Sequence, residues 1–96
     1  IKEMGENLHF VLGFVNDQRL DSILQLFPQQ GQYYFTRASI PRALDQYELA
    51  KTGASFGLKG QAYASPQKAL EAARKNAGGK DIIYVGGSTF LVSELI

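Results

Sequence analysis

The chain has 96 residues, in which ten lysines and arginines oppose nine aspartates and glutamates and leave a net charge of +1. A balance so close to neutral gives no field that would attract nucleic acid or an anionic membrane, and 45% hydrophobic with 20% charged residues is typical of a globular domain. The absence of cysteine and the single histidine, His9, exclude disulfide scaffolds, thiol chemistry and a zinc site of the usual type.

The N-terminal residues indicate a piece of a longer polypeptide. The sequence begins at Ile1, and its only methionine is Met4. Residues 1–4 are typical of the last turn of a helix that Gly5 ends. The sequence has neither a basic-then-apolar leader nor an apolar run of about 18 residues. We therefore expect one soluble, intracellular domain over residues 1–96, with no nucleic-acid or membrane partner.

The segment that follows predicts a strand, a helix and a second strand. Leu8–Phe14 is nearly continuous apolar sequence, typical of a strand buried on both faces of a sheet. From Asp17, apolar residues recur at helical spacing up to Phe27, and Pro28 stops this helix. The aromatic segment Gln32–Arg37 predicts the second strand.

The middle of the chain predicts a helix that begins near Pro41 or Asp45 and ends at Gly57. Its expected apolar stripe consists of Ala43, Leu44, Tyr47, Ala50 and Ala54.

The second half predicts two more strands, each followed by a helix. Leu58–Ala64 is the weaker strand. Ser65 and Pro66 then begin a helix whose apolar face is Ala69, Leu70, Ala73 and Ala77. Asp81–Gly87 reads as the clearest buried strand in the chain, and a final helix begins at Ser88.

This alternation predicts an α/β fold: a mainly parallel, Rossmann-like sheet of about four strands with helices on both faces. Ligands of such sheets bind at the carboxyl ends of the strands, near the point where the strand order reverses. Those ends are expected at residues 13–17, 37–42, 64–66 and 86–88.

Few residues at these ends point to chemistry. The three-glycine dinucleotide fingerprint and the GxxxxGK[ST] phosphate loop are both absent. Asp17 is more typical of a helix cap than of a ligand contact, and Arg37 and Arg42 are more typical of solvated surface arginines than of a carboxylate clamp.

Two further features concern glycine and histidine. Gly86 and Gly87 with Ser88 suit either a tight turn with a helix cap or a close approach of the backbone to a ligand. His9, inside an apolar strand, is more typical of a structural residue than of a base.

Three segments occur in the order that a known family shows. LHFVLGFVNDQRLDSILQLFP has a hydrophobic strand that ends in glycine before an acidic turn, YYFTRASIPRAL has a PRA-like segment, and DIIYVGGSTFLVSELI has a closing glycine-serine element. Together they resemble the C-terminal domain of bacterial folylpolyglutamate synthase, often bifunctional with dihydrofolate synthase, in the Mur ligase superfamily. The match covers essentially the whole chain.

The resemblance implies an ATP- and Mg²⁺-dependent amide ligase of folate and one-carbon metabolism. Such an enzyme phosphorylates a carboxylate, and the amino group of L-glutamate then displaces the phosphate. In the family, the phosphate loop and the magnesium ligands belong to the central domain, and an Asp-Gly-Ala-His-Asn-like active-site element lies just upstream of the matched region. The resemblance thus implies a cytoplasmic enzyme in which residues 1–96 form one wall of an interdomain site and are inactive alone.

The same resemblance assigns expected positions to a few residues. Arg42 of the PRA-like segment is expected to contact L-glutamate or its carboxylate. Ser88, with Gly86 and Gly87, is expected to line the amino-acid site. Asp17 is expected on the nucleotide side, in a turn that reads Asp-Gln-Arg where the family commonly has Asp-Lys-Asp, so this turn lacks the charge of the lysine. We expect no catalytic residue and no metal ligand within the 96 residues.

Two other classes stay open. A free-standing flavodoxin-like binding module has the same alternation, although a phospho-receiver needs an aspartate at the end of the third strand, which here ends in QAYAS. The C-terminal domain of a Mur cell-wall ligase usually carries an Asp-Asn-Pro-Arg-like element where this chain has SIPR. We therefore favour the folate ligase.

Overall fold

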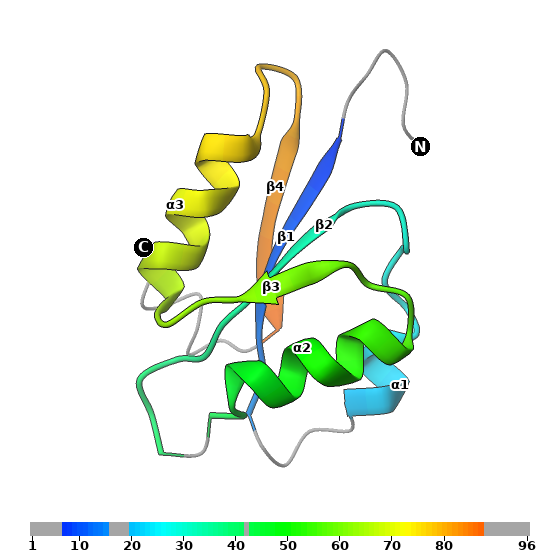
Figure 1. The fold of residues 1–96 in the computed structure, drawn as a ribbon, viewed down its shortest axis with the longest axis vertical. Helices are drawn as coiled ribbons and strands as arrows, with labels where there is room; N and C mark the ends of the chain where they lie inside the picture. The colour runs from blue at the N-terminus through cyan, green and yellow to red at the C-terminus, as the bar shows by residue number, and fades with distance from the viewer. Residues whose placement is uncertain (1–6, 16–19, 42, 88–96) are drawn as a thin grey trace.

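The computed structural model describes residues 7–15, 20–41 and 43–87, and Figure 1 shows its fold. The expectations for residues 1–4, for a helix start at Asp17 and for a final helix from Ser88 lie outside these ranges. Strands and helices alternate in the order β1 (Leu8–Gly13), α1 (Leu20–Leu24), β2 (Gln32–Phe35), α2 (Gln46–Ser55), β3 (Gly60–Ala62), α3 (Pro66–Asn76) and β4 (Ile82–Gly87). None of these helices has the length and apolarity that crossing a membrane requires.

The four strands form one sheet in the order β3-β2-β1-β4, and every pair is parallel. The chain moves outward from β1 to β3 and then returns past β1 to β4. Since parallel crossovers are right-handed, the reversal places α3 on the opposite face from α1 and α2 (Figure 1). The predicted parallel sheet with helices on both faces is confirmed.

The larger part of the core is aromatic and lies under α1 and α2. The rings of Phe10 and Tyr33 stack with centroids 4.7 Å apart, and Tyr33 stacks in turn on Phe35 at 5.8 Å. Leu24 of α1 and Leu49 of α2 close this cluster and are fully buried. Because α1 covers only Leu20–Leu24, it is shorter than the helix predicted up to Phe27, although its apolar face is the predicted one.

The apolar stripe predicted for α2 is confirmed in part: Ala43 is buried and Leu44 and Ala50 pack against the core, whereas Tyr47 and Ala54 are exposed. The buried residues of α2 are Gln46, Leu49 and Gly53, whereas Tyr47 is 64% exposed. The cause is the Phe35 ring below the helix, since a Cβ atom on Gly53 would lie 2.9 Å from its Cζ atom. The helix therefore turns Gly53 toward the sheet, whereas the neighbouring Ala54 is exposed.

The other face of the sheet is covered by α3, as its sequence predicted. Ala69 and Ala73 are fully buried against Val11 and Tyr34, where their small side chains allow a close approach. The helix begins at the predicted cap, because the Ser65 hydroxyl accepts a hydrogen bond from the Lys68 N–H at 3.2 Å.

β4 differs most from its prediction. Asp81–Gly87 was expected to be the most buried strand, yet Ile82 is 53% and Tyr84 is 48% exposed. The reason is its place in the sheet, since β4 pairs with β1 and forms the end of the described strand order.

Candidate functional site

The strand order reverses between β1 and β4, and the carboxyl ends of these two strands meet at a pair of glycines. The register aligns the strands over six residue pairs, the last of which is Gly13 beside Gly87. Ligands of open parallel sheets bind outside the carboxyl ends at such a reversal. The structure therefore brings Gly86 and Gly87 to the place where a ligand site was expected, whereas Ser88 lies outside the described residues.

The backbone at Gly87 requires glycine. Its φ of +107° lies in the region that side-chain-bearing residues avoid. A Cβ atom at Gly87 would also collide with the Gly13 carbonyl oxygen and lie 3.1 Å from a ring carbon of Phe14. The backbones of the two strand ends are thus packed without side chains between them, in the manner of a loop that brings main-chain groups close to a ligand.

The segments after β1 and β2 lie against each other beside this glycine pair. The Leu44 N–H donates to the Phe14 carbonyl at 2.8 Å, and Val15 forms an antiparallel bridge with Ala43. The PRA-like segment is thereby fixed to the end of β1 through its alanine. The two residues proposed for ligand contact in these segments, Arg42 and Asp17, lie outside the described residues.

The end of β2 is held by a buried threonine. The Thr36 N–H donates to the Leu12 carbonyl at 2.9 Å, and its hydroxyl donates to the Tyr63 carbonyl at 3.3 Å. Arg37 follows at the same edge, where its guanidinium donates to the Ile40 carbonyl at 3.5 Å. Burial, followed by electrostatic interaction with the nearby Tyr34 phenol, raises the pKa of the Tyr63 phenol.

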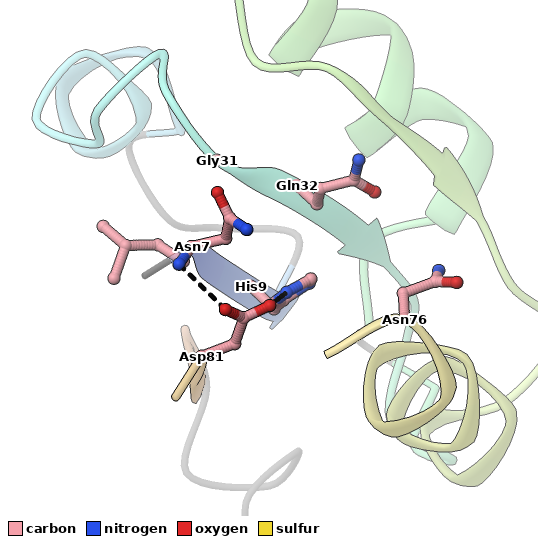
Figure 2. Close-up of a pocket in the computed structure, with 7 residues that line it drawn as sticks. Asn7, His9, Gly31, Gln32, Asn76 and Asp81 are labelled. Carbon is pink, nitrogen blue, oxygen red and sulfur yellow. Dashed lines mark hydrogen bonds and ion pairs between the residues drawn. The ribbon is translucent and has the colours of Figure 1, made fainter. Parts of the chain in front are cut away.

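A polar network that the sequence did not predict lies at the opposite, amino end of the sheet. His9 of β1 is buried, and its Nδ1 atom lies 2.9 Å from the Tyr34 hydroxyl. Its Nε2 atom lies 2.9 Å from the Asp81 carboxylate, and the Asn76 amide donates to the Tyr34 hydroxyl at 3.3 Å. Figure 2 shows the bonds of Asp81 with Asn7 and His9, beside a hollow of about 510 Å³. Both ring nitrogens of His9 are thus engaged within the fold, which is consistent with the structural role that its setting in an apolar strand favoured.

The hydrogen positions in this network follow from its members. A carboxylate only accepts, so Nε2 of His9 carries a hydrogen and donates to Asp81. In the neutral imidazole, Nδ1 then accepts from the Tyr34 hydroxyl, whose oxygen accepts from Asn76. The network joins β1, β2, the end of α3 and the turn before β4, and among the described residues no buried side-chain nitrogen or oxygen is left without a partner.

Asp81 is the anchor of this network. Hydrogen bonds from the Gly78 N–H at 2.9 Å, the His9 ring and the Asn7 N–H at 3.0 Å lower the pKa of its carboxyl from 3.8 to about 2. The charged carboxylate thus closes the turn between α3 and β4 and fixes where β4 begins. In the sequence, the one indication of this role of Asp81 was its position at the start of an apolar strand.

The described residues do not offer a metal centre. Within the ranges that the structure describes, no three histidine, aspartate or glutamate side chains come close enough to hold a cation.

Solved structures that the chain resembles in fold include folylpolyglutamate synthases of three organisms. The chain superposes on the ligand-free bifunctional folylpolyglutamate synthase/dihydrofolate synthase of Yersinia pestis with a TM-score of 0.82, at 20% identity, over 94% of this chain and 22% of that one. For the folylpolyglutamate synthase of Mycobacterium tuberculosis complexed with ADP and AMPPCP, the TM-score is 0.75 at 23% identity, over 92% and 22% of the two chains.

The third structure is E. coli FolC in complex with ADP, with a TM-score of 0.78 at 19% identity, over 99% of this chain and 22% of that one. The chain has the fold of one segment of these folylpolyglutamate synthases. It spans about a fifth of their length. No protein-family model matches the sequence, and no curated protein matches it significantly. The likeness to the folylpolyglutamate synthase segment is a likeness of three-dimensional arrangement. It confirms the predicted fold class.

Proposed function

We propose that residues 1–96 are the C-terminal domain of a folylpolyglutamate synthase, an ATP-dependent ligase that adds L-glutamate to folates. The observation that carries the proposal is the place of the closing glycine motif. The described part of the closing motif segment that resembles the family ends at Gly86 and Gly87, and these residues lie where the strand order of the sheet reverses. A similar fold, with a TM-score of 0.82, occurs in a bifunctional folylpolyglutamate synthase/dihydrofolate synthase solved with Mn, AMPPNP and L-glutamate.

In the proposed reaction, a folate carboxylate attacks the γ-phosphorus of ATP, which gives an acyl phosphate and ADP. The amino group of L-glutamate then attacks the acyl carbon, phosphate leaves, and an amide bond forms. When bound, Mg²⁺ neutralises phosphate charge during the first step. The resemblance implies that the metal and the phosphate chemistry belong to the central ATPase domain of the same polypeptide, and we assign them there. Residues 1–96 alone are then inactive.

We assign this domain the binding of the incoming amino acid. Arg42 is the proposed contact to the carboxylate of L-glutamate, because a guanidinium holds a carboxylate with two parallel hydrogen bonds. The loop of Gly86, Gly87 and Ser88 is the proposed opposite wall of that site, and Asp17 the proposed contact on the nucleotide side. Dihydrofolate synthesis from dihydropteroate is the second proposed activity, and the cytoplasm the proposed location.

The kinetics of an Arg42→Ala variant of the full-length polypeptide test the residue assignment. Loss of a charged contact to glutamate raises the KM for L-glutamate by about tenfold or more, and that for ATP by less. Arg74→Ala, which changes an exposed arginine at the end of α3, is the matched control and leaves both constants unchanged. An Arg42→Ala enzyme with unaltered glutamate kinetics removes Arg42 from the site.

A further inference from the structure

Arg37 is the one charged side chain that lies, among the described residues, within two positions after the end of a strand. It follows the end of β2, and the residues at the same distance after β1 and β3 are Val15 and Ala64. Its neighbours in the chain, Thr36 and Ala38, are both buried. A fixed stretch of backbone thus carries the guanidinium at the edge where ligands of parallel sheets bind.

The charge of Arg37 has no counter-charge in the described part of the chain. The one ion pair found there joins His9 and Asp81. The only polar contact that the structure gives the guanidinium is with the Ile40 carbonyl, and this contact is long, at 3.5 Å, and engages a single nitrogen. Since a guanidinium carries several N–H donors in a planar fork, most of its donors stay available to an anion.

Arg37 lies one strand away from Gly87, which the proposed function assigns to the wall of the amino-acid site. The Thr36 N–H donates to the Leu12 carbonyl, so the ends of β2 and β1 are paired. On its other side, β1 pairs Gly13 with Gly87 of β4. Adjacent strands are about 4.8 Å apart, which puts β2 and β4 about 10 Å apart. An arginine side chain and a bound amino acid together span such a distance.

L-Glutamate, the amino acid of the proposed reaction, brings two negative charges to its site. Its amino group attacks the acyl carbon, so its α-carboxylate and its γ-carboxylate both stay unreacted and charged. The proposed function provides one arginine, Arg42, for one of them. A carboxylate that leaves water for a protein site without a cation loses hydration and gains no charged partner. The second carboxylate therefore calls for a second cation.

We propose that Arg37 binds the second carboxylate of L-glutamate and thereby selects this amino acid over those with one carboxylate. The inference rests on the proposed function, because it takes L-glutamate as the amino acid that the site accepts. A guanidinium suits the role, since it can donate two parallel hydrogen bonds to a carboxylate. An amino acid with an amide in that place leaves the charge of Arg37 without its partner, and this difference produces the selectivity.

The kinetics of an Arg37→Gln variant of the full-length polypeptide test the inference. Rates are measured with L-glutamate and with its two amides: L-glutamine, which lacks the γ-carboxylate, and L-isoglutamine, which lacks the α-carboxylate. We expect the substitution to lower kcat/KM for L-glutamate by about tenfold or more. For one of the two amides it leaves kcat/KM unchanged, because the contact with Arg37 is already missing there.

Two further variants complete the test. Arg74→Gln, at an exposed arginine of α3, is the matched control and keeps wild-type values with all three amino acids. Arg37→Lys keeps the charge without the planar fork and recovers part of the loss with L-glutamate. For each variant, the ratio of kcat/KM between two amino acids does not depend on how much of the polypeptide is folded.

The outcomes separate this inference from the proposed function. Equal losses with L-glutamate and both amides mean that Arg37 only supports the chain at Ile40, and they overturn the inference. Unaltered glutamate kinetics of Arg37→Gln overturn it as well, and in both cases the wild-type polypeptide is still a ligase. A wild-type polypeptide that joins no L-glutamate to folate contradicts the proposed function and, with it, this role of Arg37.

Discussion

At the scale of single residues, the Tyr34 hydroxyl connects the two halves of the amino-end network, since it contacts both His9 and Asn76. Tyr34→Phe leaves Nδ1 of His9 without its partner in a buried place. We expect a loss of about 1–3 kcal/mol in the free energy of unfolding, measured by urea denaturation. Tyr47→Phe, at a residue that is 64% exposed, is the control and stays within about 0.5 kcal/mol of wild type. Equal stability of the two variants contradicts the role of the network.

The acid dependence of stability tests Asp81. Its carboxyl has a folded pKa of about 2, below its ordinary value of 3.8, so the unfolded chain binds the proton more tightly. The stabilisation that this difference provides is fully present above the ordinary pKa and is lost as the pH falls through about 2. Stability measured against pH therefore falls more steeply in this window for wild type than for Asp81→Asn.

Asp21→Asn is the matched control for the pH measurement, because Asp21 is an exposed carboxylate of α1 outside the network. Between pH 3.8 and about 2, the free energy of unfolding of Asp21→Asn falls with pH as steeply as that of wild type. If the difference in free energy of unfolding between wild type and Asp81→Asn stays constant through this pH window, Asp81 is not a charged anchor.

At the scale of elements, the turn at the end of β4 depends on a glycine. Gly87→Ala places a Cβ atom against the Gly13 carbonyl oxygen at a φ of +107°, so it costs more than about 1 kcal/mol of unfolding free energy. Gly79→Ala is the control, since a Cβ atom there meets nothing within 4 Å. It leaves stability nearly unchanged. If both variants unfold at the same denaturant concentration, the close packing of the two strand ends is refuted.

Local patterns in the sequence were sufficient to predict the order and type of the elements. The apolar run from Leu8, the Ser65 cap and the glycine at the end of β4 each act through neighbouring residues, and the structure confirms them. The buried face of α2 depends instead on where the Phe35 ring lies, and the exposure of β4 depends on its position in the sheet. Neither can be read from helical or strand periodicity.

The candidate site, too, was predicted only where its features depend on neighbouring residues. That Gly86 and Gly87 lie at a strand end followed from the local sequence, and the reversal of strand order beside them followed only from the topology. The His9 network escaped prediction because its members are 25 to 72 residues apart in the chain. Pairings at such separations leave no periodic signal.

At the scale of the whole molecule, the described residues form a four-stranded sheet with an aromatic core on one face and an alanine-lined helix on the other. The carboxyl edge of the sheet carries a glycine pair and an arginine, Arg37, at neighbouring strand ends. On our proposal, this edge contributes to the binding of the incoming amino acid, and the groups that transfer the phosphoryl group belong to another domain.

The measurement that tests this account most directly compares the full-length polypeptide with the 96-residue chain. Each is incubated with ATP, Mg²⁺, L-glutamate and a reduced folate, and the glutamate joined to folate is quantified together with the ADP released. We predict turnover, with one ADP for each amide bond, by the full-length polypeptide and none by residues 1–96. Turnover by residues 1–96 alone, or its absence in the folded full-length polypeptide, contradicts the account.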